Sequence, residues 1–187
     1  PLPEVMVSGE LKDTGDAAIR KAINVRPAKW PLRFKRSFGF GARCVNTLDC
    51  HVVYDGMRYG RSSSVGAGVD PYAAAELDLW KGTQASFGFA EPVEVRWRAP
   101  DGTALEASVD LRSIFKGRQV LHVVPRHEVS ELPGGDHDLP VHVLLEVNGR
   151  SINVYMRAYV PTRHLQRAGQ VLRGSRRDLI LAKTLRC

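Results

Sequence analysis

Alternation of apolar and polar residues is clearest between residues 93 and 111, where it predicts two adjacent strands. Val93, Val95 and Trp97 fall on one face of the first segment, with charged residues between them. Pro, Asp and Gly follow at 100–102, and apolar residues then alternate again from Leu105 to Leu111. A period of two on both sides of such turn residues is typical of a β-hairpin with one buried face.

The same pattern predicts two further hairpins and one more strand. Residues 141–160 alternate on both sides of Asn148-Gly149, the strongest short-range signal for a tight hairpin turn. Residues 51–59 carry Asp55-Gly56 between two short apolar runs. A half-buried strand is expected over 32–40, where Leu and Phe alternate with basic and small residues.

The remaining elements are expected to be short. Asp110 should cap one helical turn that ends at Gly117, and 119–124 is predicted as a strand. Pro125 should open a short helix that closes before Pro133-Gly134-Gly135. Residues 60–92 are expected to be irregular apart from one short helix over 72–80, and the pattern of 178–181 does not distinguish helix from strand. The whole pattern predicts a mainly β fold, either an antiparallel β-sandwich or a β-rich α+β domain with a few short helices.

The length of 187 residues suits one domain with a sizeable core. Residues 1–30 form an N-terminal segment with no strand pattern and room for one short helix, and residues 31–187 are expected to form a single β-rich domain. No apolar run approaches the roughly 18 residues of a membrane-spanning helix. The sequence begins at Pro1 without an initiator Met, so removal of an upstream segment such as a signal peptide is expected.

Positive charge is concentrated in two stretches. The net charge is +7, residues 20–43 contain eight basic residues and no acid, and residues 162–187 contain seven against Asp178 alone. Such surfaces suit nucleic acid, anionic lipid or an acidic protein, and they are also typical of plain solvated faces. The C-terminal stretch lacks the interleaved aromatic residues of a single-strand binder, so a nucleic-acid partner is not expected.

The spacing of Cys44 and Cys50 fits no common zinc motif and favours a local disulfide. Such a bond would place the protein in an oxidising compartment, whereas the alternative is a pair of reduced thiols in the cytosol. Cys187 remains unpaired in this scheme and no role is expected for it.

Motifs for catalysis or cofactor binding do not emerge. The chain has no G-x-S-x-G elbow and no Walker loop, and Gly39-Phe40-Gly41 is better explained as a bend in a strand. Asp136, His137 and Asp138 are adjacent in a Gly/Pro-rich loop and cannot all face one metal ion. We therefore predict no catalytic residue, no metal and no cofactor, and the protein is not expected to be an enzyme.

Seven groups of motifs within about 31–184 have a familiar combination. They are Pro31-Leu32-Arg33-Phe34 with Phe38, Cys44-x5-Cys50 with Val52-Val53-Tyr54, Val95-Arg96-Trp97 with Asp101-Gly102, Val109-Asp110-Leu111 with Ile114-Phe115, Leu144 to Asn148, Val154 to Ala158 with Val160-Pro161-Thr162, and Asp178 to Ala182. Together these motifs resemble the immunity proteins encoded beside type VI secretion phospholipase effectors, in particular those of the phospholipase D class.

The resemblance implies a periplasmic protein that binds a toxic phospholipase effector and blocks its active site without any catalysis of its own. The family's N-terminal lipidated cysteine is missing from this sequence, so membrane anchoring would need a lipid-modified segment upstream. Protruding loops are the expected contacts, because a loop reaches into a cleft where a flat sheet cannot. The candidate partner-binding residues are Arg58, Tyr59, Arg61, Asp136, His137 and Asp138. The alternatives are a basic nucleic-acid or anionic-surface binder, an enzyme with a dispersed site, or an envelope protein of another role.

Overall fold

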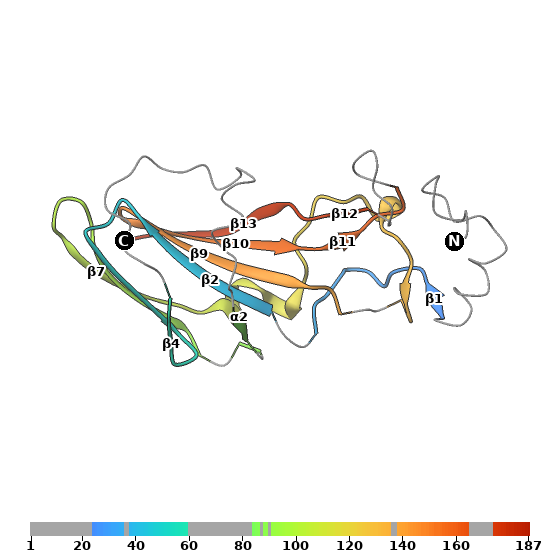
Figure 1. Ribbon diagram of the computed structural model, residues 1–187, viewed down its shortest axis with the longest axis horizontal. Helices are drawn as coiled ribbons and strands as arrows, with labels where there is room; N and C mark the ends of the chain where they lie inside the picture. Colours follow the sequence, from blue (N-terminus) through green and yellow to red (C-terminus); the bar gives the residue numbers. More distant parts are fainter. Residues whose placement is uncertain are drawn as a thin grey trace, which may run out of the picture.

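A computed structural model describes residues 24–35, 38–59, 84–86, 88–89, 91–135, 138–164 and 174–187. Two sheets dominate the described chain, as Figure 1 shows. The larger sheet has the strand order β13 (Leu179–Arg186), β10 (Ser151–Ala158), β9 (Val141–Asn148), β2 (Phe38–Val45) and β5 (Gln84–Ser86). The smaller sheet has the order β4 (Met57–Tyr59), β3 (Asp49–Tyr54), β6 (Val93–Arg98) and β7 (Ala104–Val109). The prediction of a mainly β fold is confirmed.

All three predicted hairpins are present, as β3–β4, β6–β7 and β9–β10. Asp55 and Gly56 both have positive φ, at 50° and 70°, as a tight primed turn requires. The β9–β10 turn is displaced by one residue from the prediction. Asn148 pairs with Ser151, so Gly149 and Arg150 form the turn and Gly149 takes the positive φ of 57°.

The pairing of β2 with β9 is parallel, which a fold made only of hairpins does not provide. The two strands are about a hundred residues apart in sequence and meet in the middle of the larger sheet. After Val45 the chain passes from β2 in the larger sheet to β3 in the smaller sheet. Because β2 therefore forms no hairpin with the next strand, its edge is free to pair with the distant strand β9. The larger sheet is therefore mixed, with one parallel pairing among antiparallel ones.

The apolar faces of both sheets pack against each other in one core. Phe34, Trp97, Val109, Leu145 and Val154 all belong to it, as the alternation predicted. The Cys44–Cys50 disulfide, with an S–S distance of 2.01 Å, joins β2 of one sheet to β3 of the other. The predicted disulfide is confirmed, and it is typical of a protein from an oxidising compartment.

Several predictions for the shorter elements also hold. The helical turn α2 (Leu111–Ile114) is present, and the Asp110 carboxylate accepts a hydrogen bond from the Arg112 amide at 3.0 Å. The single turn η3 (Lys116–Arg118) follows it, and Gly117 has a φ of 64°. The backbone at Gly117 therefore has the left-handed conformation that favours glycine.

The segments after α2 depart from prediction. Residues 119–124 do not form a sheet strand: their pairing with the segment 32–34 is limited to one isolated antiparallel bridge between Arg33 and Gln119, beside which the Val120 amide donates to the Leu32 carbonyl at 2.8 Å. The helix expected after Pro125 is one turn, η4 (Arg126–Glu128): Pro125 is its N-cap, extended with ψ 145°, and the backbone is extended again at Val129, with ψ 129°. Leu132 instead lies in β8 (Leu132–Pro133), which pairs with β1 (Val25–Arg26).

The C-terminal apolar stretch opens an eight-residue strand, β13, at one edge of the larger sheet. Its alternation is broken by a bulge opposite Val154 and Tyr155 of β10, so the pattern in the sequence is weak. A further pair, β11 (Val160–Pro161) with β12 (Ser175–Arg176), follows β10. The helices predicted near residues 16–23 and over 72–80 lie outside the described residues.

The smaller sheet covers only part of the larger one. Beyond it, the chain segments 27–34 and 119–132 supply Leu32, Val120, Val124 and Val129 to the same core. In Figure 1 the strands β1 and β11 lie at one end of the molecule, and β4, β7 and the C-terminus lie toward the other. No helix in the described part of the chain is long and apolar enough to cross a membrane.

Candidate partner-binding site

A cavity of about 400 Å³ lies at the end of the molecule away from the smaller sheet. Its lining combines an exposed tryptophan with cationic side chains and contains no carboxylate: Pro27, Ala28, Trp30, Arg126, His127, Val129 and Arg163. These residues come from the stretch after β1, from η4 and from the residues after β11. We refer to it as the Trp30 pocket.

Trp30 is held in place by the backbone on both sides of it. The Lys29 amide donates to the Gly135 carbonyl at 2.7 Å, and the Leu32 carbonyl accepts from the Val120 amide at 2.8 Å. The Trp30 side chain remains 40% exposed between these anchors. An indole this exposed on a fixed backbone presents a rigid apolar surface to a partner.

Two neighbouring side chains contact the Trp30 ring. The His122 ring meets it edge-on with centroids 5.2 Å apart, and the Arg126 guanidinium carbon lies 5.7 Å from the ring centre. The second contact is a cation–π interaction, which orients the guanidinium while leaving its N–H groups available. Burial lowers the pKa of His122, so this ring is neutral at pH 7 and adds no charge.

The positive charge of the pocket is not neutralised within the described chain. Arg163 donates from Nε to the Val129 carbonyl at 3.1 Å, which fixes its side chain without an acidic partner. Neither Arg126 nor Arg163 forms an ion pair with any residue that the structure describes. Glu128 lies beside the pocket, but its carboxylate faces His127 at 3.8 Å. The pocket therefore offers two oriented guanidinium groups next to an apolar ring, which suits an anionic group with an apolar neighbour.

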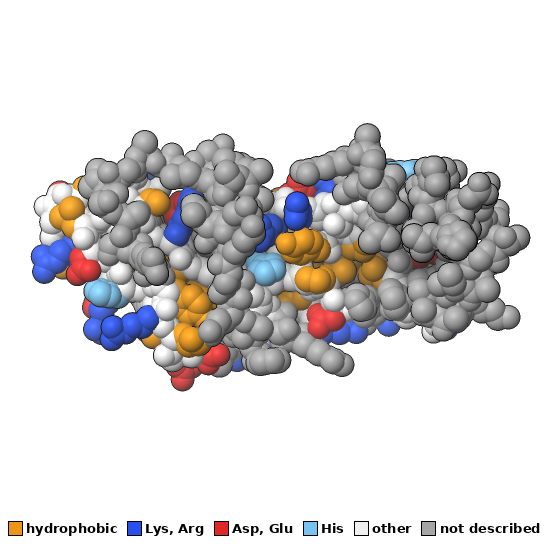
Figure 2. Space-filling model, in the orientation of Figure 1, with side chains coloured by type: hydrophobic (Ala, Val, Ile, Leu, Met, Phe, Trp, Pro, Cys, Tyr) orange, Lys and Arg blue, Asp and Glu red, His pale blue; other side chains and the backbone are white. Residues whose placement is uncertain are grey.

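A second cavity, of about 370 Å³, lies on the outer face of the smaller sheet. Side chains of both signs line it: Asp49 contacts His51 at 3.1 Å, Arg96 contacts Glu106 at 3.9 Å, and Arg98 lies beside them, all on exposed residues. Figure 2 shows the two signs of charge intermixed at this end of the molecule. Such a face is typical of a solvated surface.

Three of the residues predicted to bind a partner, Arg58, Tyr59 and Asp138, lie within the described part of the chain. Arg58 and Tyr59 lie on β4, an edge strand of the smaller sheet. The Tyr59 ring packs edge-on against Phe40 with centroids 4.8 Å apart, and burial raises its pKa, with Asp55 adding to the effect. Tyr59 is thus partly a core residue, while Arg58 beside it is exposed.

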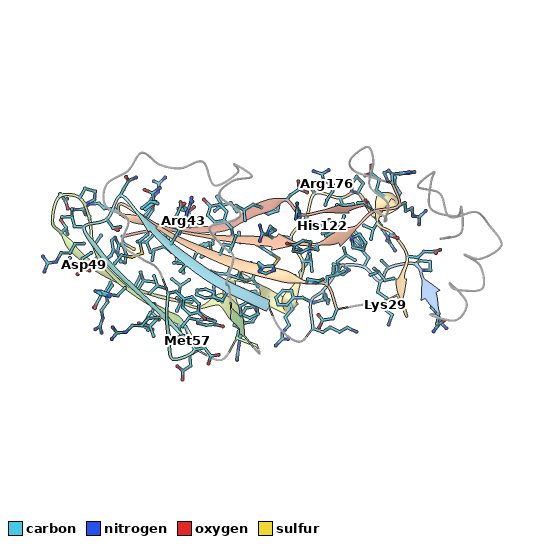
Figure 3. All side chains as sticks on the ribbon, in the orientation of Figure 1. Lys29, Arg43, Asp49, Met57, His122 and Arg176 are labelled. Carbon is cyan, nitrogen blue, oxygen red and sulfur yellow. A yellow bond between two sulfur atoms is a disulfide. The ribbon has the colours of Figure 1, made fainter. Side chains whose placement is uncertain are left out.

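The second group of candidate contacts is Asp136, His137 and Asp138. The Gly135 carbonyl accepts from the Lys29 amide, and the Asp138 carboxylate accepts from the Lys35 amide at 2.6 Å, so both described residues bond to the segment that carries Trp30. Figure 3 labels Lys29 and Met57 of β4, which lie in different parts of the molecule. Arg61, Asp136 and His137 lie outside the described residues.

Sequence reasoning did not find the Trp30 pocket. Trp30 stands outside every alternating run, although it lies within the acid-free basic stretch 20–43. A tryptophan that belongs to no predicted strand but lies within such a basic stretch was the feature of the sequence that could have indicated the pocket. Among the described residues, no group of three or more His, Cys, Asp and Glu side chains could hold a metal ion.

Comparison of the chain with protein-family models, with curated protein sequences and with solved structures found no match.

Proposed function

We propose that this protein is an immunity protein that binds a type VI secreted phospholipase in the periplasm and blocks its active site. The Trp30 pocket is the centre of the contact, and it receives an acidic side chain of the phospholipase together with an adjacent apolar group. The protein acts by binding and performs no turnover.

The observation that carries the proposal is the composition of the pocket. Trp and Arg are the residue types most enriched among the side chains that dominate protein–protein binding energy. Here an exposed Trp lines one pocket with two Arg side chains that lack acidic partners within the described chain. Complementary charge on the partner would speed association and select the correct surface.

Two further features agree with this proposal. The resemblance described above points to a phospholipase as the partner, and the disulfide fits an oxidising compartment such as the periplasm. Gly135, at the start of the segment 134–140, bonds to Lys29 next to Trp30 and so borders the pocket.

The test uses the phospholipase encoded beside this protein. At equimolar concentration, the wild-type protein should abolish phospholipid hydrolysis and co-elute with the enzyme. The double variant Arg126→Glu/Arg163→Glu should weaken the complex at least about 100-fold, because two attractive contacts become repulsive. Trp30→Ala should weaken it as well, with the fold intact by circular dichroism.

Arg96→Glu is the matched control, since Arg96 is an exposed arginine of β6 whose contact with Glu106 is solvated. This variant should inhibit as well as the wild type. Full lipase activity at molar excess of the wild-type protein, without co-elution, would refute the proposed function. Oligonucleotide binding that falls steeply with salt and is lost in the pocket variants would favour a nucleic-acid partner instead.

A further inference from the structure

Arg157 lies on the opposite face of the larger sheet from the core. It sits on β10, in register with His142 of β9 on one side and with Leu179 of β13 on the other. His142 in turn pairs with Gly39 of β2, so Arg157 belongs to a row that crosses the sheet. The row lies near the end of β10 from which the chain continues to Tyr159.

The Arg157 side chain is buried, and its Nε has no hydrogen-bonding partner. The residue is only 7% exposed, and no acceptor lies within reach of this enclosed nitrogen. Its guanidinium carbon lies 6.0 Å from the centre of the Tyr159 ring, in a cation–π contact. A cation–π contact orients the group and satisfies none of its N–H donors.

Arg43 on the same face shows how a paired arginine is arranged here. Its Nε and Nη2 both donate to Oε2 of Glu146 on the adjacent strand, and Oε1 of Glu146 accepts from Asn153 at 3.2 Å. Thr184 donates to the Asn153 side chain at 2.8 Å, so one polar row spans four strands. Glu146 cannot form an ion pair with Arg157, because Glu146 lies opposite Asn153, which is four residues or about 13 Å from Arg157 along β10.

The other groups around Arg157 leave its charge uncompensated. His142 faces it, and burial together with the Arg157 charge lowers the pKa of His142, so the imidazole is neutral at pH 7. Asp178, which precedes Leu179, is bonded to Arg176 at 2.9 Å. No residue in the described part of the chain forms an ion pair with Arg157. An enclosed Nε–H with no acceptor is costly, and an anion bonded to the guanidinium offsets part of the cost of this buried charge.

We propose that Arg157 is the centre of a binding site for a small oxyanion, the phosphate or carboxylate group of a ligand, on the outer face of the larger sheet. The planar guanidinium donates two parallel N–H bonds to two oxygens of that group. The Tyr159 ring holds the guanidinium from one side, and the neutral His142 ring lines the site without repelling it. This site lies on the face of the larger sheet that points away from the core, and it shares no residue with the Trp30 pocket. The proposal for Arg157 therefore does not depend on the proposed function.

Thermal unfolding at constant ionic strength tests the proposal, with sodium chloride replaced stepwise by sodium phosphate at pH 7.5. The midpoint of the wild-type protein should rise and saturate, because a ligand that binds the folded state stabilises it. Arg157→Met should abolish the rise, or weaken the apparent affinity at least about 10-fold. Arg96→Met, which removes an exposed arginine, should keep the full rise.

Parallel titrations with acetate, glycerol 3-phosphate and dihexanoyl phosphatidic acid distinguish the sources of the oxyanion. Free phosphate as the ligand predicts no gain from the glycerol or acyl groups, whereas a lipid headgroup predicts tighter binding of the phosphatidic acid. A preference for acetate over phosphate would identify a carboxylate ligand.

A measurement on the wild-type protein guards against a variant that does not fold. The Nε–Hε signal of Arg157 should shift on phosphate addition in an NMR spectrum, with Arg157→Lys used to assign it. Equal thermal responses of Arg157→Met and the wild type, or an Arg157 signal that does not move at saturating concentrations of any of the four anions, would overturn the proposal.

Discussion

Replacement of Trp97 tests how the two sheets are held together. The side chain is only 3% exposed within the shared core. Its indole Nε1 donates to the Gly149 carbonyl at 2.7 Å, so a side chain of the smaller sheet bonds to the β9–β10 turn of the larger one. Trp97→Ala removes both the packed ring and this bond, and should lower the free energy of unfolding by about 3–5 kcal/mol.

Trp97→Phe separates the two contributions. It keeps most of the buried ring and removes the donor to Gly149, whose carbonyl lies at a partly exposed turn and can bond to water. The expected loss is therefore about 1–2 kcal/mol, close to that of one hydrogen bond plus a small packing defect.

Urea unfolding followed by far-UV circular dichroism measures both variants without relying on tryptophan fluorescence. For a chain of this size, Trp97→Ala should move the midpoint down by about 1–2 M. Trp30→Ala is the control, because its side chain is 40% exposed, and it should cost less than about 1 kcal/mol. A loss below about 1 kcal/mol for Trp97→Ala would show that Trp97 does not join the sheets.

Three further predictions concern the disulfide, the pH dependence and a turn. Replacing both Cys44 and Cys50 by Ala should cost about 2 kcal/mol in urea unfolding, because the bond spans a sequence separation of only 6; an unchanged midpoint would contradict this. Stability should fall as the pH drops below about 6.5, because burial lowers the folded-state pKa of His142 and the unfolded chain then binds more protons; His142→Asn should flatten the profile between pH 7 and 5. Gly135→Ala should lower the melting temperature more than Gly134→Ala, because both have positive φ but only at Gly135 would a Cβ lie 2.8 Å from a backbone carbonyl oxygen.

The hairpins could be predicted from the sequence because each is a local structure. Two alternating runs and a short turn lie within about twenty residues, so strand identity, buried face and approximate turn can all be inferred from neighbouring residues. The same holds for the Asp110 cap and for the Cys44–Cys50 pair. Even here the β9–β10 turn shifted by one residue, because Gly149 rather than Asn148 adopts the positive φ.

The sheet order required the tertiary structure. The parallel pairing of β2 with β9 joins distant segments, and no turn signal marks it. Residues 119–124 have a strand-like composition but bond to the chain at 32–34, because that is the neighbour the fold provides. A local pattern determines which residues are buried and leaves open which segment covers them.

Both proposed sites depend on contacts of this long-range kind. The Trp30 pocket combines residues from three segments, 27–30, 126–129 and 163, and none of these segments carries a recognisable motif. Arg157 looks in the sequence like one more polar position in an alternating strand, and only the structure shows that its Nε is enclosed without an acceptor. The sequence alone determined the strands and their buried faces, because these follow from periodicity along the chain. Only the tertiary structure decided which charges lack partners, because that depends on distances between residues that the chain does not place side by side.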